Sequence, residues 1–248
     1  GDAGRLLRAG AVDRMQQVVQ NYKSGQLLLM DVPVPACGPG HVLVRTIYSA
    51  ISPGTEMMKV SESKLSLFGK ARARPDQVKK VMQSIAQQGL AATYRKVSGQ
   101  LDSLTPLGYS LCGQVVEVGP GVDEFAPGDL VACAGNAHAL HAEFNVVPTM
   151  LCQRVPEGVD PRQAALTTIA AIGLQGIRQA KVEIGESVCV IGLGLIGQIL
   201  VRLLVGAGAT VIGVDLEAER CRSAEAAGAV STHCPGGGEA VAAFADRV

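Results

Sequence analysis

A G-x-G-x-x-G motif near the end of the chain constrains the fold most strongly. It comprises Gly192, Gly194 and Gly197, with Leu195 and Ile196 between the last two. An apolar run over Ser187–Ile191 precedes it, and a helical pattern follows. A second strand is expected over 210–214, and Asp215 ends it. A glycine-rich turn from a buried strand into a helix, with an acidic residue after the next strand, is typical of a dinucleotide-binding βαβ unit.

Each position of the motif has a physical role in such a site. Gly192 would permit the tight turn, Gly194 would let a pyrophosphate approach the backbone, and Gly197 would let the helix pack closely on the strand. Backbone N–H groups at Leu195 and Ile196 would face the phosphates. Asp215 would accept hydrogen bonds from a ribose and repel a 2′-phosphate, so NAD is favoured over NADP. The alternative is that the glycines form only a packing turn.

The region before this unit is expected to be rich in β-structure. Short apolar runs separated by Pro and Gly indicate a small barrel or a partly open β-domain. The expected strands cover residues 17–20, 26–30, 41–48, 113–119, 130–133, 141–147 and 151–155. We expect an irregular extension over 1–14, a β-domain over 15–160 with a helical insert at 57–105, a connecting helix over 161–180, and a partial Rossmann domain over 181–248. Asp160 and Pro161 suit the start of the connecting helix.

Composition excludes several classes of function. Lys plus Arg and Asp plus Glu are both 22 in 248 residues, so no charge excess favours nucleic acid or an anionic membrane. Aromatic residues are 3% of the chain, too few for a base-stacking platform. The seven cysteines form no C-x-x-C pair, which argues against a disulfide framework or a zinc ribbon and suits a reducing cytoplasm. Cys112, Cys133 and Cys189 are expected to be buried.

The order of these elements resembles that of the medium-chain dehydrogenase/reductase superfamily. The residues that carry the resemblance are Pro39–Val44, Pro106–Tyr109 before Gly113–Gly119, Gly128–Val131 and Gly185–Gly194. The resemblance covers about residues 15–235. It implies an α/β plus β fold: a GroES-like β-barrel domain followed by the first half of a Rossmann domain.

The chain departs from the zinc enzymes of that superfamily at the metal ligands. Ile51–Glu56 has no Cys or His, Gly108-Tyr109-Ser110 replaces a Gly-His-Glu, and Leu166–Ala171 has no ligand. Four closely spaced cysteines for a structural zinc are absent from the sequence. Because hydroxyl and methyl groups do not replace thiolate and imidazole on Zn²⁺, we expect neither a catalytic nor a structural zinc.

Without zinc, hydrogen bonds would have to polarise a carbonyl. Thr55 and Tyr109 are the hydroxyl candidates, and Glu56 is a candidate base or orienting group, because the resemblance places them at the zinc site of relatives. Thr55 and Glu56 could instead cap a helix, and Tyr109 could be a core aromatic. His138 and His141 lack a third metal ligand and are expected to be structural. The basic cluster Lys70–Arg74 is expected on a solvated surface, with phosphorylated substrates as the alternative.

Three functions remain open. The first is a zinc-independent, NAD-dependent oxidoreductase acting on a secondary alcohol or carbonyl. Ser52–Glu56, Lys70–Asp76, Pro106–Ser110 and Ala132–Gly135 resemble a zinc-less bacterial branch found as the first half of bi-domain oxidoreductases, which implies a sugar or sugar-nucleotide substrate. The second is a zinc-less quinone or enone reductase. The third is a non-catalytic nucleotide-binding module.

The length bears on all three functions. Residues 181–248 have room for about three strands, whereas a full Rossmann domain has six. The first strand would then lie at an apolar edge. We therefore expect a truncated part of a longer protein, and either a homo-oligomer or a part of a larger chain.

Overall fold

A computed structural model describes residues 13–21, 24–52, 54 and 104–235. The chain divides into two compact units, the first ending at Leu166 and the second beginning at Thr167. Each unit is described by itself. None of the helices in the described ranges is long and apolar enough to cross a membrane.

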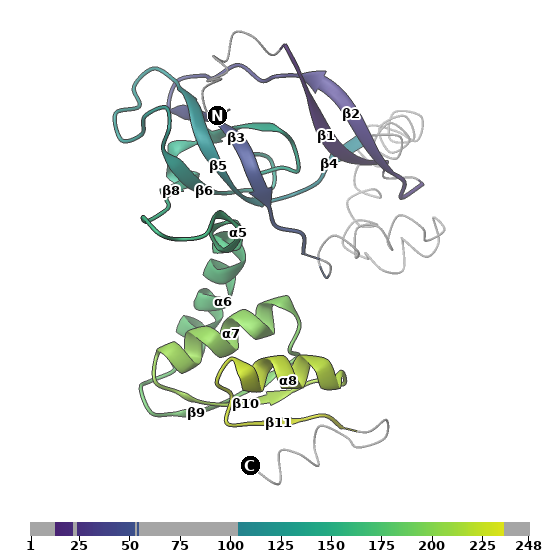
Figure 1. Ribbon diagram of the computed structural model, residues 1–248, viewed down its shortest axis with the longest axis vertical. Coiled ribbons are helices and arrows are strands. Elements are labelled where there is room, and N and C mark those ends of the chain that lie inside the picture. The colour runs from purple at the N-terminus through teal and green to yellow at the C-terminus, as the bar shows by residue number, and fades with distance from the viewer. Residues whose placement is uncertain (1–12, 22–23, 53, 55–103, 236–248) are drawn as a thin grey trace, which may run out of the picture. The chain divides into compact units, whose positions relative to one another are not determined.

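The first unit contains two antiparallel sheets (Figure 1). One has the order β2 (Leu27–Pro33), β1 (Arg14–Asn21), β4 (Leu104–Pro106). The other has the order β7 (Phe144–Pro148), β3 (His41–Ser49), β5 (Ser110–Val118), β6 (Leu130–Ala134), β8 (Cys152–Arg154). A 3₁₀ turn, η2, covers Thr149–Leu151. The core of the five-stranded sheet is formed by β-branched and small apolar side chains, among them Val42, Val44, Val115, Val131 and Cys133.

The predicted β-rich domain is confirmed, with its curled sheet forming part of a barrel. Strand β1 begins at Arg14, one residue inside the predicted extension. Leu104 and Thr105, predicted to end the helical insert, instead belong to strand β4. Thr105 pairs with Gln20 of β1, and this long-range pairing was not visible in local spacing. Residues 57–103 of the predicted insert lie outside the described residues.

A short helix, α5 (Pro161–Ala164), closes the first unit. Asp160 is its N-cap, accepting a hydrogen bond from the backbone N–H of Arg162, as predicted. The continuous helix predicted over 161–180 is wrong in one respect, because the helix is interrupted at residues 165–166 and resumes as α6 (Thr167–Ala180). The side chain of Ser110 donates a 2.6 Å hydrogen bond to the carbonyl of Ala165 at this interruption.

The second unit is a parallel α/β layer. Its three strands have the order β11 (Ser231–His233), β10 (Thr210–Val214), β9 (Ser187–Ile191). Helices α7 (Leu195–Gly206) and α8 (Ala218–Ala226) connect successive strands, and α6 packs against α7. Figure 1 shows α7 and α8 beside the strands that they connect. The predicted partial Rossmann architecture is confirmed.

Strand β9 is less buried than its apolar sequence predicts. Ser187, Cys189 and Ile191 are exposed, whereas Val190 is buried. A continuous apolar run is typical of a strand covered on both faces. Among the described elements, the connecting helices pack against Val190, and β9 pairs only with β10. The expectation of a buried Cys189 is therefore wrong, and the expected edge position of this strand is confirmed.

Candidate cofactor site

The glycine-rich loop joins β9 directly to α7. Gly192 has a φ of +90°, a left-handed conformation that side chains other than glycine rarely adopt. Its N–H donates to the carbonyl of Val214 at the end of β10, which fixes the turn to the neighbouring strand. Gly194 is the N-cap of α7, and a Cβ added there would meet no atom within 4 Å. The backbone at Gly194 therefore offers an open approach to a ligand.

Gly197 has a different environment. A Cβ at this position would overlap the carbonyl oxygen of Gly192, and Val190 of β9 lies just beyond, at 3.8 Å. The first turn of α7 thus lies against the loop as closely as a glycine allows. Leu195 and Ile196 are the first two residues of this helix, and the N–H groups of a first turn have no partners within the helix.

Asp215 follows β10 and lies beside the loop. Its side chain is only 6% exposed. One carboxylate oxygen accepts a 2.7 Å hydrogen bond from Leu193 N–H, and the other accepts a 2.9 Å bond from Glu217 N–H. Burial acts to raise the pKa of Asp215, but these two bonds and the nearby Arg220 guanidinium outweigh it and lower that pKa. The carboxylate is therefore held in its charged form.

Leu193 is fixed from three sides. Besides the bond from its N–H to Asp215, its carbonyl accepts a 3.2 Å hydrogen bond from the side chain of Gln198. Its side chain is fully buried on Gly213, where an added Cβ would come within 2.9 Å of Leu193 Cδ1. The loop is thus held by the side chain of Asp215, which follows β10, and by that of Gln198 on α7.

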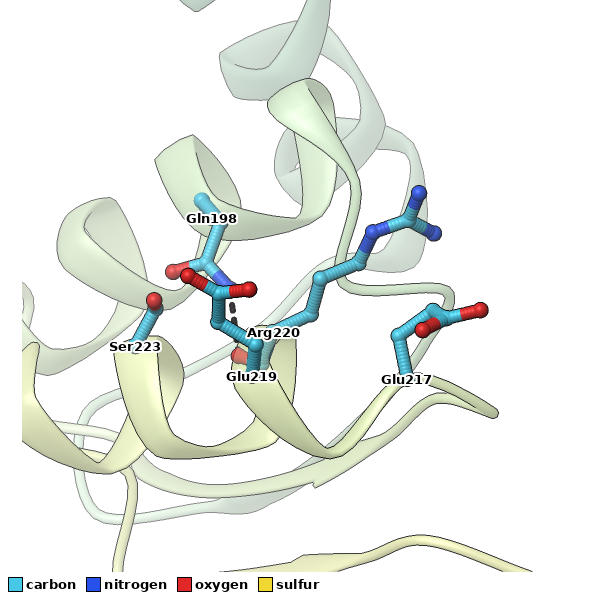
Figure 2. A pocket seen from close by; sticks show the side chains of 5 residues that line it. All are labelled: Gln198, Glu217, Glu219, Arg220 and Ser223. Atoms are coloured by element: carbon cyan, nitrogen blue, oxygen red, sulfur yellow. Dashed lines mark hydrogen bonds between the residues drawn. The ribbon is translucent and has the colours of Figure 1, made fainter.

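A pocket of about 380 Å³ lies next to these residues, between the N-terminal parts of α7 and α8. Figure 2 shows its lining, formed by Gln198, Glu217, Glu219, Arg220 and Ser223. Gln198 Nε2 donates a 2.8 Å bond to the carbonyl of Arg220 across the pocket. The Arg220 side chain is 55% exposed and lies 3.5 Å from the Asp215 carboxylate.

Sequence reasoning did not identify Arg220 or Gln198. The available signal was their spacing, since Gln198 directly follows the last glycine of the motif and Arg220 lies on the first turn of the helix after Asp215. A basic residue beside the predicted ribose site bears on the choice between NAD and NADP.

Of the three predicted catalytic residues, the structure describes only Tyr109. Thr55 and Glu56 lie outside the described residues. Tyr109 directly precedes β5 and is 9% exposed, and its carbonyl accepts a 3.0 Å bond from Gly135 N–H. Gly108 beside it has a φ of +103°, and an added Cβ would meet the backbone of Leu140 and His141. Tyr109 therefore lies between a glycine that packs against the backbone of residues 140–141 and the start of β5.

The two histidines predicted to be structural have different neighbours. The ring of His138 lies 6.5 Å from that of His41, and its Nδ1 is 3.3 Å from the carbonyl of Val146. His141 Nδ1 lies 2.8 Å from the hydroxyl of Ser49, at the end of β3. The backbone nitrogen of His141 lies 2.6 Å from where a Cβ on Gly108 would be, so the backbone of His141 packs against the residue before Tyr109.

A metal ion would need at least three ligands of suitable chemistry. In the ranges that the structure describes, no three His, Cys, Asp or Glu side chains form such a group. Tyr109 and Ser110 occupy the last two positions of the Gly-His-Glu motif of the zinc enzymes, and both residues are buried. The Ser110 hydroxyl already donates a hydrogen bond to the carbonyl of Ala165. The described residues do not fit a zinc ion at this position.

Comparison with solved structures decides the fold. Acetophenone reductase from Geotrichum candidum, in complex with NAD, matches with a TM-score of 0.69 at 20% identity, over 91% of this chain and 64% of that chain. A putative zinc-binding dehydrogenase from Sinorhizobium meliloti, bound to NADP, matches with a TM-score of 0.67 at 23% identity, over 92% and 64%. The chain therefore has the fold of these dehydrogenases and reductases.

Sequence relatives agree with this assignment. D-guloside 3-dehydrogenase from Shigella flexneri is 37% identical over 124 residues, which are 50% of this chain and 35% of the relative. (R,R)-butanediol dehydrogenase from Bacillus subtilis is 30% identical over 165 residues, 57% of this chain and 48% of the relative. The chain thus matches between about a third and a half of the length of these relatives. No model of a protein family matches it.

Proposed function

We propose that the chain binds a nicotinamide dinucleotide and serves an oxidoreductase that transfers hydride between the cofactor and a secondary alcohol or carbonyl. The observation that carries the proposal is the glycine-rich loop, open at Gly194 and fixed by Asp215 at the N-terminus of α7. The names of the relatives, a guloside dehydrogenase and a butanediol dehydrogenase, support alcohol–carbonyl chemistry. We propose a small sugar or sugar nucleotide as the substrate.

NAD is the cofactor that we propose. A carboxylate has about four lone-pair sites, and backbone N–H groups take two of those on Asp215. The remaining sites can accept ribose hydroxyls, whereas a 2′-phosphate would meet a buried negative charge. Arg220 partly offsets this charge, so NADP is the competing outcome.

We propose a reaction without zinc. A bound nicotinamide supplies the hydride donor or acceptor. Hydroxyl groups would polarise the substrate carbonyl, with Tyr109 in this role together with Thr55, and Glu56 as the base or orienting group. The Ser49–His141 pair is a second candidate for moving the proton, because the imidazole nitrogen and the hydroxyl lie 2.8 Å apart and each group can donate or accept.

Two alternatives lead to different experimental results. A zinc-less quinone or enone reductase needs no group to deprotonate an alcohol, so the Tyr109 and His141 side chains would be dispensable for its turnover. A non-catalytic nucleotide-binding module would bind NADH without turnover. We also propose a cytoplasmic location and either a homo-oligomer or a part of a larger chain, in which a small molecule rather than nucleic acid or a membrane is the partner.

Fluorescence titration with NADH, followed by a spectrophotometric substrate screen, tests the proposal. We expect saturable NADH binding that Gly194→Val abolishes, because a side chain there would occupy the open approach to the loop. Gly206→Val, at the other end of the same helix, is the matched control, since that position also faces open space. Turnover with sugar-derived alcohols supports the leading function. Turnover with quinones alone favours the first alternative, and binding without turnover favours the second.

A further inference from the structure

Two cysteines far apart in the sequence meet in the core of the first unit. Cys133 of β6 and Cys152 of β8 are directly paired in the antiparallel register. Their Sγ atoms lie 3.7 Å apart, and both side chains belong to the hydrophobic cluster on one face of the five-stranded sheet. All seven cysteines lie in the described ranges, and the structure contains no disulfide among them.

The backbone geometry suits a covalent link. Directly opposed residues of antiparallel strands have Cα atoms about 4.5–5.5 Å apart, within the range of about 4.4–6.8 Å that disulfides span. The sulfur atoms would need to approach from 3.7 Å to about 2.05 Å. Strand β8 has three residues and is the last strand of its sheet, so a small adjustment of β8 breaks no pairing on its outer side among the described strands.

We propose that Cys133 and Cys152 are a redox modification site, at which hydrogen peroxide converts the thiol pair into a cross-strand disulfide. Cys152, which is only half-buried, reacts first. Its thiolate attacks one oxygen of the peroxide and becomes a sulfenic acid. The O–O bond breaks, and the other oxygen leaves as hydroxide, which takes up a proton to form water. The Cys133 sulfur then displaces the sulfenic hydroxyl, forming the S–S bond and a second water. Two thiols lose two electrons and two protons in total, and one peroxide is reduced to two waters.

The environment of the two thiols supports this order. Contact with Cys152 and burial raise the pKa of Cys133 far above its usual range, so Cys133 is the weaker first nucleophile. In the cytoplasmic location proposed above, this disulfide would be transient, as most disulfides of reducing compartments are.

Cys112 is a control that the structure itself provides. It lies on β5, next to Leu111, which is the register partner of Cys133. Its side chain packs with Ala164 and Ala165, in a cluster separate from that of Cys133 and Cys152. Alternation along the strand therefore places it on the opposite face of the sheet, where it cannot link to Cys152.

Mass spectrometry of the full chain after treatment with hydrogen peroxide tests the site. Free thiols are blocked with N-ethylmaleimide, and cleavage after glutamate separates Cys133, on a peptide ending at Glu143, from Cys152, on a peptide ending at Glu157. We expect these two peptides to be linked, the number of titratable thiols to fall by two of the seven, and dithiothreitol to reverse both changes.

Variants complete the experiment. Cys152→Ser is expected to abolish the loss of the two thiols, whereas Cys112→Ala and Cys234→Ser are expected to keep the link. A link from Cys152 to any other cysteine would overturn the proposal. So would the absence of a link at peroxide concentrations that oxidise the exposed Cys234, and this measurement on the unaltered chain does not depend on any variant folding.

Discussion

The carboxylate of Asp215 accepts a 2.7 Å hydrogen bond from the backbone N–H of Leu193, in the middle of the glycine-rich loop. The residue proposed to contact the ribose therefore also holds the loop proposed to contact the phosphates. Removing that carboxylate should affect the folded state and the ligand together.

Asp215→Asn is expected to lower the free energy of unfolding by about 1–3 kcal/mol, because an amide replaces a buried acceptor of two backbone N–H groups. It should also raise the Kd for NADH. Urea denaturation and fluorescence titration measure the two effects. Asp31→Asn is the control, since its ion pair with Arg14 is exposed and should contribute little. Unchanged stability would show that the carboxylate does not anchor the loop.

Gly197→Ala is expected to destabilise the second unit by several kcal/mol and to abolish cofactor binding. A Cβ at this position overlaps the carbonyl oxygen of Gly192, and neither backbone segment can move without disturbing β9 or α7. Gly206→Ala in the same helix meets nothing within 4 Å and should stabilise the chain by up to about 1 kcal/mol. Parallel urea curves compare the two variants, and equal effects would contradict the close packing of the loop.

Local sequence signals predicted the second unit well, because its strands and helices are each formed by neighbouring residues. The ranges Ser187–Ile191 and Thr210–Val214 match strands β9 and β10. The exposure of Cys189 was missed, since an apolar run does not reveal how many faces of its strand are covered. The contacts Cys133–Cys152 and Ser49–His141 were missed for a different reason. They depend on sheet register between distant segments, which spacing along the chain does not encode.

The first unit is expected to lose stability between pH 9 and 11. Burial raises the pKa of Cys112 from 9.0 to about 11. In the unfolded chain the thiol ionises near the lower of these two pKa values. The stabilising contribution is therefore complete below that pH and falls as the pH rises toward the folded-state pKa. Urea denaturation across this range should show a shallower loss for Cys112→Ala than for the unaltered chain, and identical slopes would contradict the assignment.

Oxidation of the Cys133–Cys152 pair is expected to raise thermal stability. The bond would close the loop formed by residues 134–151, which the chain-entropy model values at about 3 kcal/mol. For a chain of this size that corresponds to a rise in Tm of roughly 6–12 °C. Calorimetry before and after peroxide treatment measures the shift, and dithiothreitol should reverse it. Cys152→Ser should show no shift under the same treatment. A lower Tm in the linked protein would mean that forming the bond strains β6 and β8 by more than the loop closure stabilises them.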